Sequence, residues 1–362
     1  MIITYYVLTF LLVITTFLPR INDQHWFFRI WDFGKVQLVI MQFLLLIWGF
    51  VYIEFDNLLL IICQGILAFT FIFNSAVLIR FTSLYKTYKQ DKSVRKSKSV
   101  SLLSVNVYQF NDEYERLINL IERIKPDIVL TMESNYNWDM ALEKLDSSYK
   151  HSKKIPQENT YGMHFWTNLE VKKIKVNHFM SDDIPSIHCS LKTEDGWDFD
   201  FIGIHPPPPS PTEEETSKER DGELLSVAKI VKDMDTPVVV AGDFNNVAWA
   251  KSSMLFKRIS QLIDPRVGRG FVSTFHAKYW FLRFPIDLFF HSEKVYIEEF
   301  KAEEAVGSDH FPLYTKFHIG SSDNPETVNV EKQEEDDTEE MEEMIDEGKH
   351  TQSERKEVVT ED

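Results

Sequence analysis

The chain has 362 residues, with 39 lysines and arginines, 56 aspartates and glutamates, and a formal net charge of −17. Most of this charge lies at the end, because residues 320–362 hold 17 acidic and only 4 basic residues. The distribution excludes a uniformly acidic globule, and equally a basic protein that binds nucleic acid broadly. The two cysteines, Cys63 and Cys189, exclude a disulfide-rich scaffold and a cysteine-based zinc site.

Residues 1–80 are predicted to form a membrane region of three transmembrane helices. Three runs lack any charged residue or histidine: Met1–Leu18, Val36–Ile53 and Leu58–Ile79. Each is close to the roughly 20 helical residues that a bilayer core requires. The first run lacks a basic start and a small-residue cleavage site, so we interpret it as retained. The polar residues within the runs either bond between helices or face the bundle or the membrane interface: Gln37, Gln42, Gln64 and Asn74.

The flanking basic residues predict an orientation. The first connection holds Arg20, Arg29 and Lys35, the second holds no basic residue, and a basic linker at residues 81–99 follows the third run. The positive-inside rule therefore places the N-terminus outside and everything after Arg80 in the cytoplasm. The linker either lies against anionic headgroups or is simply a flank that stops transfer.

Residues 100–319 have the pattern of a soluble domain with mixed strands and helices. Strands are expected at Leu102–Asn106, Ile128–Met132, Val171–His178, Asp198–His205, Pro237–Ala241, Ile286–His291 and Pro312–His318. One helix is expected from a cap at Asn111 to Lys125, and another around Leu224–Val231. About 220 residues of this kind are enough for one α/β or α+β domain with its own core.

The acidic tail at residues 320–362 is predicted to be disordered. It has few aliphatic residues and no aromatic residue, so it buries too little surface to offset the entropy of ordering. Met341, Met344 and Ile345 suggest, as an alternative, a transient helix or a partner motif.

Polar residues recur where the predicted strands end, which is where α/β folds place their functional sites. Alone, each has an ordinary structural explanation such as a turn, a cap or a buried hydrogen bond. Their joint occurrence in one domain favours a site instead. The residues are Asn106, Glu133, His205, Asp243 and Asn245 in Gly-Asp-Phe-Asn, Asp287 in Pro-Ile-Asp, and Asp309 and His310 in Ser-Asp-His.

In this order, these motifs resemble the endonuclease/exonuclease/phosphatase family, of which deoxyribonuclease I, neutral sphingomyelinases and inositol-polyphosphate 5-phosphatases are members. The resemblance covers residues 100–318 only. It implies a four-layer α/β sandwich of two mixed β-sheets flanked by helices, here preceded by three transmembrane helices. It also implies hydrolysis of a phosphate ester with Mg²⁺, or alternatively Mn²⁺, as cofactor.

By this resemblance Glu133 is the main metal carboxylate and Asp309 a second one, with Asn106 orienting a metal-bound water or a phosphate oxygen. Hard oxygen ligands of this kind suit Mg²⁺. The remaining roles are catalytic or substrate-binding, and they fall on Asp243 (the attacking water), Asn245 (a nonbridging oxygen), His310 paired with Asp287, His205 (stabilising or protonating the phosphate), and Arg283 (a phosphate contact or only a surface residue).

Two departures from the apurinic-endonuclease branch are visible. Tyr108 stands where that branch often has an acidic residue, and His205 stands where it tends to have tyrosine. Both favour the deoxyribonuclease, sphingomyelinase and phosphatase side. Tyr161-Gly162 and Asn168 fall near a further active-site segment of such relatives.

The sequence thus predicts a membrane-anchored, metal-dependent phosphoesterase that uses direct attack by water. The substrate is either a lipid headgroup, which tethering favours, or nucleic acid, for which residues 100–319 show no basic stripe. The competing hypothesis is a catalytically silent membrane scaffold that uses the acidic tail to bind a protein partner.

Overall fold

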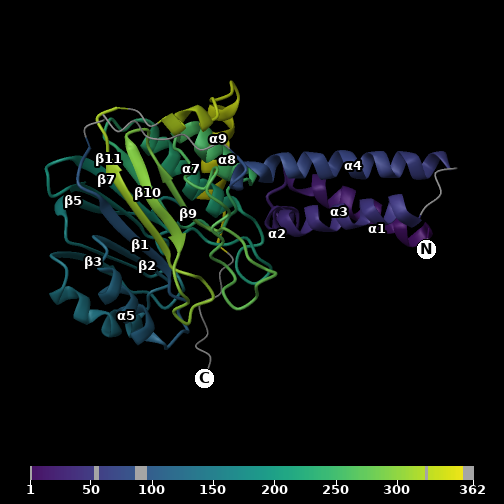
Figure 1. The fold of residues 1–362 in the computed structure, drawn as a ribbon. Coiled ribbons are helices and arrows are strands. Elements are labelled where there is room, and N and C mark those ends of the chain that lie inside the picture. The colour runs from purple at the N-terminus through teal and green to yellow at the C-terminus, as the bar shows by residue number, and fades with distance from the viewer. Residues whose placement is uncertain (1, 53–56, 86–95, 323–324, 354–362) are drawn as a thin grey trace.

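A computed structural model describes residues 2–52, 57–85, 96–322 and 325–353. A β-rich domain carries a long helical bundle at one end, in which α1, α3 and α4 run side by side (Figure 1). The bounds of these helices are Ile2–Phe17 for α1, Lys35–Tyr52 for α3 and Leu58–Leu78 for α4. They coincide with the three apolar runs of the sequence.

These helices are apolar enough to cross a membrane. Ile2–Arg20 and Leu58–Phe81 each meet the length and hydropathy of a span. A third span results if α2 (Trp26–Phe33) and α3 count together, although the two helices meet at an angle of 69°. The bundle also exposes many large apolar side chains, among them Ile3, Phe10, Leu44, Phe50, Phe69 and Ile72. Such a continuous apolar surface is atypical of a protein surrounded by water.

Polar residues of the bundle bond between helices. Asn74 Nδ2 and Gln42 Nε2 each donate to Thr16 Oγ1 at 3.0 Å, and Gln64 Nε2 donates to the Leu46 carbonyl at 2.9 Å. The interhelical alternative is therefore confirmed for these three residues. Gln37 differs, because its Nε2 donates to the Phe281 carbonyl of the β-rich domain at 2.8 Å.

Two β-sheets build the domain. The six-stranded sheet has the order β10-β11-β1-β2-β4-β3, with β10 Val295–Ala302, β11 Leu313–Ile319, β1 Val100–Asn106, β2 Ile128–Met132, β4 Met163–Thr167 and β3 His151–Ile155. The five-stranded sheet has the order β5-β6-β7-β8-β9, with β5 Glu170–Asn177, β6 Ser186–Lys192, β7 Asp198–Ile204, β8 Val238–Asp243 and β9 Asp287–His291. Both sheets are mixed, since β1–β2 and β7–β8 are parallel and the other pairs are antiparallel.

Alternation along the strands creates three apolar layers between four layers of structure. Leu102 and Val239 point into the core between the sheets, whereas their neighbours Leu103 and Val240 point outward. The outer face of the six-stranded sheet is covered by α5 (Tyr114–Ile124) and α6 (Tyr136–Ala141). The other outer face is covered by α7 (Lys218–Lys232), α8 (Lys251–Ser260) and α9 (Asp337–His350). The predicted four-layer sandwich is confirmed.

The predicted strands appear as β1, β2, β5, β7, β8, β9 and β11 with small shifts at their ends, while β3, β4, β6 and β10 are additional. The predicted helix that Asn111 was expected to cap begins at Tyr114. Asn111 Nδ2 instead donates to the carbonyls of Val107 and Val306, so it joins two loops. Within the described residues there are also short 3₁₀ helices at Leu18–Arg20, Ile79–Phe81, Glu143–Ser147 and Pro325–Asn329.

The expected disorder of residues 320–362 is wrong for much of that segment, because residues 337–350 form α9. Met341, Met344 and Ile345 lie at helical spacing and are buried in the core under α7 and α8. Gly222 of α7 and Gly348 of α9 allow the two helices to touch, since a Cβ on Gly348 would lie 2.8 Å from the Lys218 carbonyl oxygen. Arg258 adds a bidentate bond to Asp337 at 2.7–3.1 Å. The burial of these three apolar side chains therefore stabilises α9 in spite of the acidic composition of the segment, because most of the acidic side chains of the helix face water. Residues 354–362 of the tail lie outside the described part of the chain.

We expect Ile345→Ala to release α9 from the domain. Removing a buried isoleucine side chain costs about 2–5 kcal/mol in a well-packed core, and this helix has few other apolar contacts. Hydrogen exchange of residues 337–350 should therefore accelerate at least about tenfold. Glu339→Ala, the same truncation on the exposed face, serves as the control. Equal protection in both variants would contradict the docking of α9.

The bundle meets the domain through a second apolar cluster. Leu78 and Phe81 at the end of α4 pack with residues 247–250, and Trp249 Nε1 donates to the Asp32 carbonyl at 2.8 Å. Arg80 bonds Glu331 at 2.5 Å. Of the predicted basic linker at 81–99, Lys86, Lys89, Lys92 and Arg95 lie outside the described residues.

Candidate active site

All of the predicted site residues except Arg283 converge on one edge of the two sheets. Two pairs of parallel strands, β1–β2 and β7–β8, bring their carboxyl ends to this edge. The antiparallel neighbours β9 and β11 begin there, and Asp287 of β9 pairs directly with Asp243 of β8. Sequence segments about 200 residues apart therefore deliver their polar residues to a single place.

Asn106 links the two acidic groups at the centre. Its Nδ2 donates to Glu133 Oε1 at 2.8 Å and to Asp243 Oδ2 at 3.0 Å. Its Oδ1 accepts from the Tyr108 backbone N–H at 3.0 Å, so the amide oxygen is already engaged. Asn106 therefore positions two carboxylates, and its predicted contact with a metal-bound water or a phosphate oxygen stays a prediction.

Glu133 follows β2 with an unusual backbone. Its φ of 59° lies in the left-handed region, which costs a non-glycine residue free energy and is often found at functional sites. Its Oε2 accepts from the Gln109 backbone N–H at 3.1 Å. Burial, together with a smaller effect of the negative charge of Asp309, raises the pKa of Glu133 to about 7, against the opposing effects of its hydrogen bonds and of His310.

Asp243 ends β8 in the Gly-Asp-Phe-Asn motif. The motif requires glycine at 242, because φ is 147° and a Cβ there would lie 1.9 Å from the Ile204 carbonyl oxygen of β7. Asp243 Oδ1 accepts from the Asn245 backbone N–H at 2.9 Å. Asn245 has a φ of 47°, which asparagine tolerates, and its Nδ2 donates to the Pro206 carbonyl at 3.0 Å. Burial and the neighbouring Asp287 raise the pKa of Asp243.

His310 and Asp287 form a buried pair beside Asp243. His310 Nδ1 lies 2.8 Å from Asp287 Oδ2, and His310 Nε2 lies 3.6 Å from Asp243 Oδ2. Burial alone would lower the pKa of His310, but Asp287 and Asp243 outweigh it and raise that pKa to about 10. Near pH 7 this histidine is therefore a cation held between two carboxylates.

His205 completes the ring from the opposite side. Its Nε2 lies 3.9 Å from Asp243 Oδ2, and its ring lies 5.5 Å from the ring of Tyr161. Burial lowers the pKa of His205 to about 4, so it is neutral near pH 7. Its buried Nδ1 has no hydrogen-bond partner among the described residues, which leaves this atom available to a bound molecule.

Two separate groups of residues at the site offer ligand atoms to a metal ion. Ligand atoms of Asp243, Asp287 and His310 lie within 4.8 Å of one another. In that set, however, His310 Nδ1 is already bonded to Asp287. The carboxylates of Glu133 and Asp309 line the same cavity, and their mutual repulsion leaves negative charge that a cation would offset. The site thus fits a divalent cation by the chemistry of its oxygen donors.

The structure gives different outcomes for the remaining sequence hypotheses, which concern Arg283, Tyr161 and Asn168. Arg283 places its guanidinium 4.9 Å from the centre of the Phe311 ring and is absent from the described lining of the cavity, so its predicted phosphate contact has no support from this position. Tyr161 does line the cavity. Asn168 lies elsewhere, at the start of β5, where its Oδ1 accepts from the Lys150 backbone N–H.

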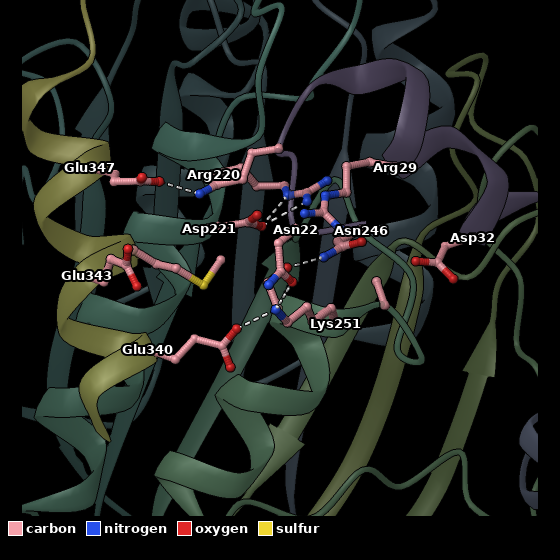
Figure 2. A pocket seen from close by; sticks show the side chains of 14 residues that line it. Asn22, Arg29, Asp32, Arg220, Asp221, Asn246, Lys251, Glu340, Glu343 and Glu347 are labelled. Atoms are coloured by element: carbon pink, nitrogen blue, oxygen red, sulfur yellow. Dashed lines mark hydrogen bonds and ion pairs between the residues drawn. The ribbon is translucent and has the colours of Figure 1, made fainter. Parts of the chain in front are cut away.

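Sequence reasoning missed a buried supporting residue, Arg220 of α7. It donates to Asp221 at 2.8–2.9 Å and to the Asn245 carbonyl at 3.1 Å, so it fixes the loop that carries Asn245. Figure 2 shows it in a neighbouring polar cavity, where Glu340 of α9 reaches Lys251 of α8. The sequence does not indicate that Arg220 is buried, because this residue lies in a charged helical stretch. The burial results from α2 and α9, which cover this part of α7.

A cavity of about 890 Å³ opens above the site, and its polar floor is formed by Glu133, His205, Asp243, Asn245, Asp309 and His310. Its walls contain residues that the sequence did not indicate, including Phe110, Thr160 and Phe275. Trp26, Phe27, Ile30, Trp31 and Phe33 of α2 also line it. A possible signal for α2 was its apolar spacing around the charged Arg29 and Asp32.

Residues 103–310 match a family model described as the endonuclease/exonuclease/phosphatase family. None of the curated proteins compared with the sequence matches it. Because the family match begins at residue 103, it bears on the β-rich domain and leaves the helical bundle untested.

Solved structures of low sequence identity share the fold. D. rerio TDP2 complexed with a single-strand DNA product has a TM-score of 0.52 and 17% identity over 61% of this chain and 99% of that chain. The human Nocturnin catalytic domain with bound sulfate has 0.51 and 14%, over 63% and 97%. A family protein from Bacteroides thetaiotaomicron has 0.50 and 16%, over 63% and 100%. At these identities the similarity establishes the fold alone.

Proposed function

The chain belongs to the endonuclease/exonuclease/phosphatase family, and from this membership we propose that it is a membrane-anchored, metal-dependent hydrolase of phosphate esters. The observation that carries the proposal is the convergence of Glu133, Asp243, Asp309 and the Asp287–His310 pair on one cavity floor. Carboxylates, a cationic histidine and a neutral histidine around one space are what phosphate hydrolysis by water requires.

Glu133 and Asp309 would hold the metal. When bound, Mg²⁺ or Mn²⁺ supplies charge neutralisation at the phosphate. Asp243 is placed to orient and deprotonate the attacking water, because Asn106 and the Asn245 N–H fix both of its oxygens. The cationic His310 contacts a phosphate oxygen, and Asp287 holds its ring.

Asn245 and His205 line the same cavity, and the second amide hydrogen of Asn245 and the unpartnered Nδ1 of His205 would bond substrate oxygens. Because His205 is neutral near pH 7, it serves as a hydrogen-bond partner rather than as a permanent cation. The described lining contains no serine or cysteine, which supports direct attack by water over a covalent intermediate on those residues.

The membrane part of the proposal rests on the apolar bundle. The first connection, with Arg20, Arg29 and Lys35, and Arg80 directly after α4 lie at the end of the bundle that meets the domain (Figure 1). The positive-inside rule then puts this end and the catalytic domain in the cytoplasm. Protease added outside sealed cells should leave residues 96–353 intact. If the protease removed them, the orientation would be the opposite of the one proposed.

Metal removal tests the chemistry. We expect EDTA to abolish hydrolysis of a chromogenic phosphodiester by the full chain, and Mg²⁺ or Mn²⁺ to restore it. Glu133→Gln should raise the metal concentration for half-maximal rate at least about tenfold, because it removes a charged oxygen ligand. Glu170→Gln, an exposed change on β5, should leave that concentration unaltered.

Two outcomes of the same assay would contradict the proposal. An equal rate in EDTA would exclude a metal-dependent reaction. Silence on phosphodiester and phosphomonoester substrates, with the domain folded, would favour the scaffold hypothesis instead.

A further inference from the structure

The active-site cavity has two unlike halves. Its floor is polar and holds the catalytic candidates, whereas its walls are mainly apolar. One part of the apolar wall is the exposed side of α2, with Trp26, Phe27, Ile30 and Trp31, and another comes from the segment 275–286, with Phe275, Leu282, Phe284 and Ile286. No lysine or arginine occurs among the described lining residues. A polyanionic strand that extends beyond the catalytic floor would therefore meet no lysine or arginine among these described lining residues.

The α2 wall is a built part of the molecule, although it lies outside the family-matched residues 103–310. The Trp26 backbone N–H donates to the Glu215 carbonyl at 2.8 Å, and the Ser217 N–H donates to the Gln24 carbonyl at 2.7 Å. On the other face of the helix, Arg29 and Asp32 are buried. These contacts turn Phe27, Ile30 and Trp31 outward, toward the cavity and its rim.

The rim of the cavity, formed by α2 and the loop of residues 279–282, lies at the membrane surface if the helical bundle spans the bilayer. If α3 crosses the bilayer, α2, which meets it at 69°, lies close to the membrane plane. Gln37, in the first turn of α3, bonds the Phe281 carbonyl at 2.8 Å, so the loop of residues 279–282 sits at the same level. Tyr279, Trp280 and Phe281 in this loop are 51%, 78% and 52% exposed. Exposed tyrosine and tryptophan are typical of the interface between membrane and water.

We propose that the substrate is an amphiphilic phosphate ester taken directly from the membrane, with its phosphate on the polar floor and its hydrocarbon chain between α2 and residues 279–286. This inference rests on the proposed hydrolase function. Moving a chain from bilayer to an apolar wall costs little, because both surroundings are hydrocarbon-like. The phosphate can then reach Asp243 and His310 without exposing the chain to water.

A pair of chromogenic diesters tests the apolar walls without requiring the natural headgroup. Full-length protein in phosphatidylcholine nanodiscs is given 4-nitrophenyl dodecyl phosphate or 4-nitrophenyl methyl phosphate with Mg²⁺. The readout is the ratio of the two kcat/KM values. We expect Ile30→Gln to lower this ratio at least about tenfold, since a polar side chain at this position removes apolar surface against which the dodecyl chain is buried. Partitioning into the nanodisc is the same for both proteins and cancels.

Met140→Gln, which changes an exposed apolar side chain on α6, away from the cavity lining, should keep the wild-type ratio. An unaltered ratio in Ile30→Gln, with the methyl ester still hydrolysed, would overturn this inference alone. So would a higher kcat/KM for a single-stranded oligonucleotide than for the dodecyl ester. Hydrolysis of neither ester, by wild-type protein that is folded, would overturn the proposed function and this inference with it.

A second measurement probes the position of the rim directly. Brominated phosphatidylcholine in the nanodisc quenches tryptophan within the interface. The quenched fraction of the total fluorescence should fall in Trp280→Phe, because Trp280 is the most exposed aromatic side chain of the loop. An unchanged quenched fraction would place the loop away from the lipid and contradict the proposal.

Discussion

Replacing Asp243 by asparagine should lower the rate of metal-dependent hydrolysis by about 10³-fold or more while the domain remains folded. The carboxylate lies between Asn106, the Asn245 N–H and the two histidines of the cavity floor. Asparagine keeps its size but cannot accept a proton from water. The loss should appear in kcat at saturating substrate and metal.

Stability should respond weakly to the same change. Burial and Asp287 raise the pKa of Asp243, so its charge opposes folding, and removing that charge offsets the lost bond to Asn106. We therefore expect the melting temperature to stay within about 5 °C of wild type. Asp127→Asn, which disturbs a carboxylate bonded to the Ser101 backbone far from the cavity, should retain activity. Full activity in Asp243→Asn would remove this residue from the mechanism.

The residues of the cavity floor were predictable because strand ends leave a strong pattern. Four consecutive apolar residues before Gly-Asp-Phe-Asn predict a buried strand, and a polar residue directly after it has to lie at the sheet edge. The same reasoning found Asn106 and Glu133 after shorter apolar runs. It gave the position of each residue along its strand, but no distance between strands.

The missed strands lack such patterns. In β3, Lys153 and Lys154 follow His151, and the strand lies at the sheet edge with little burial. In β6, the polar residues His188 and Ser190 interrupt the apolar residues. The sequence does not indicate that His188 bonds Asp200 within the sheet. Pairing with neighbours, which is a tertiary property, determines these strands.

The walls of the cavity were unpredictable for another reason. Trp26–Phe33 stands between two apolar runs, so it was interpreted only as their connection. Its role depends on the loop of residues 206–217 reaching back to Gln24 and Trp26, a contact of almost 200 residues in sequence separation. Composition likewise misjudged α9, whose three apolar residues matter only because Gly222 allows a close approach.

The second prediction with a large expected effect on the reaction rate concerns the Asp287–His310 pair. Asp287→Asn should lower kcat by about 10²–10⁴-fold, because an amide holds the ring less firmly and no longer favours its cationic form. Asp287 and Asp243 together raise the pKa of His310 to about 10. With Asp287 neutral, the imidazolium loses its largest electrostatic support and keeps those of Asp243 and Asp309, so the pKa of His310 falls. A reaction that needs the cation is active below this pKa and is lost as the pH rises through it.

The alkaline limb of the pH–rate profile should therefore move to lower pH in Asp287→Asn, measured at saturating metal at each pH. Asp200→Asn is the matched control, since Asp200 bonds His188 at 2.9 Å in the five-stranded sheet, away from the cavity. Asp200→Asn should reduce stability and leave the profile in place. A shift of the same size in both variants would assign the effect to folding, because His188 has no contact with the cavity floor among its described partners. A shift in Asp287→Asn alone requires that the charge on His310 acts in the reaction itself.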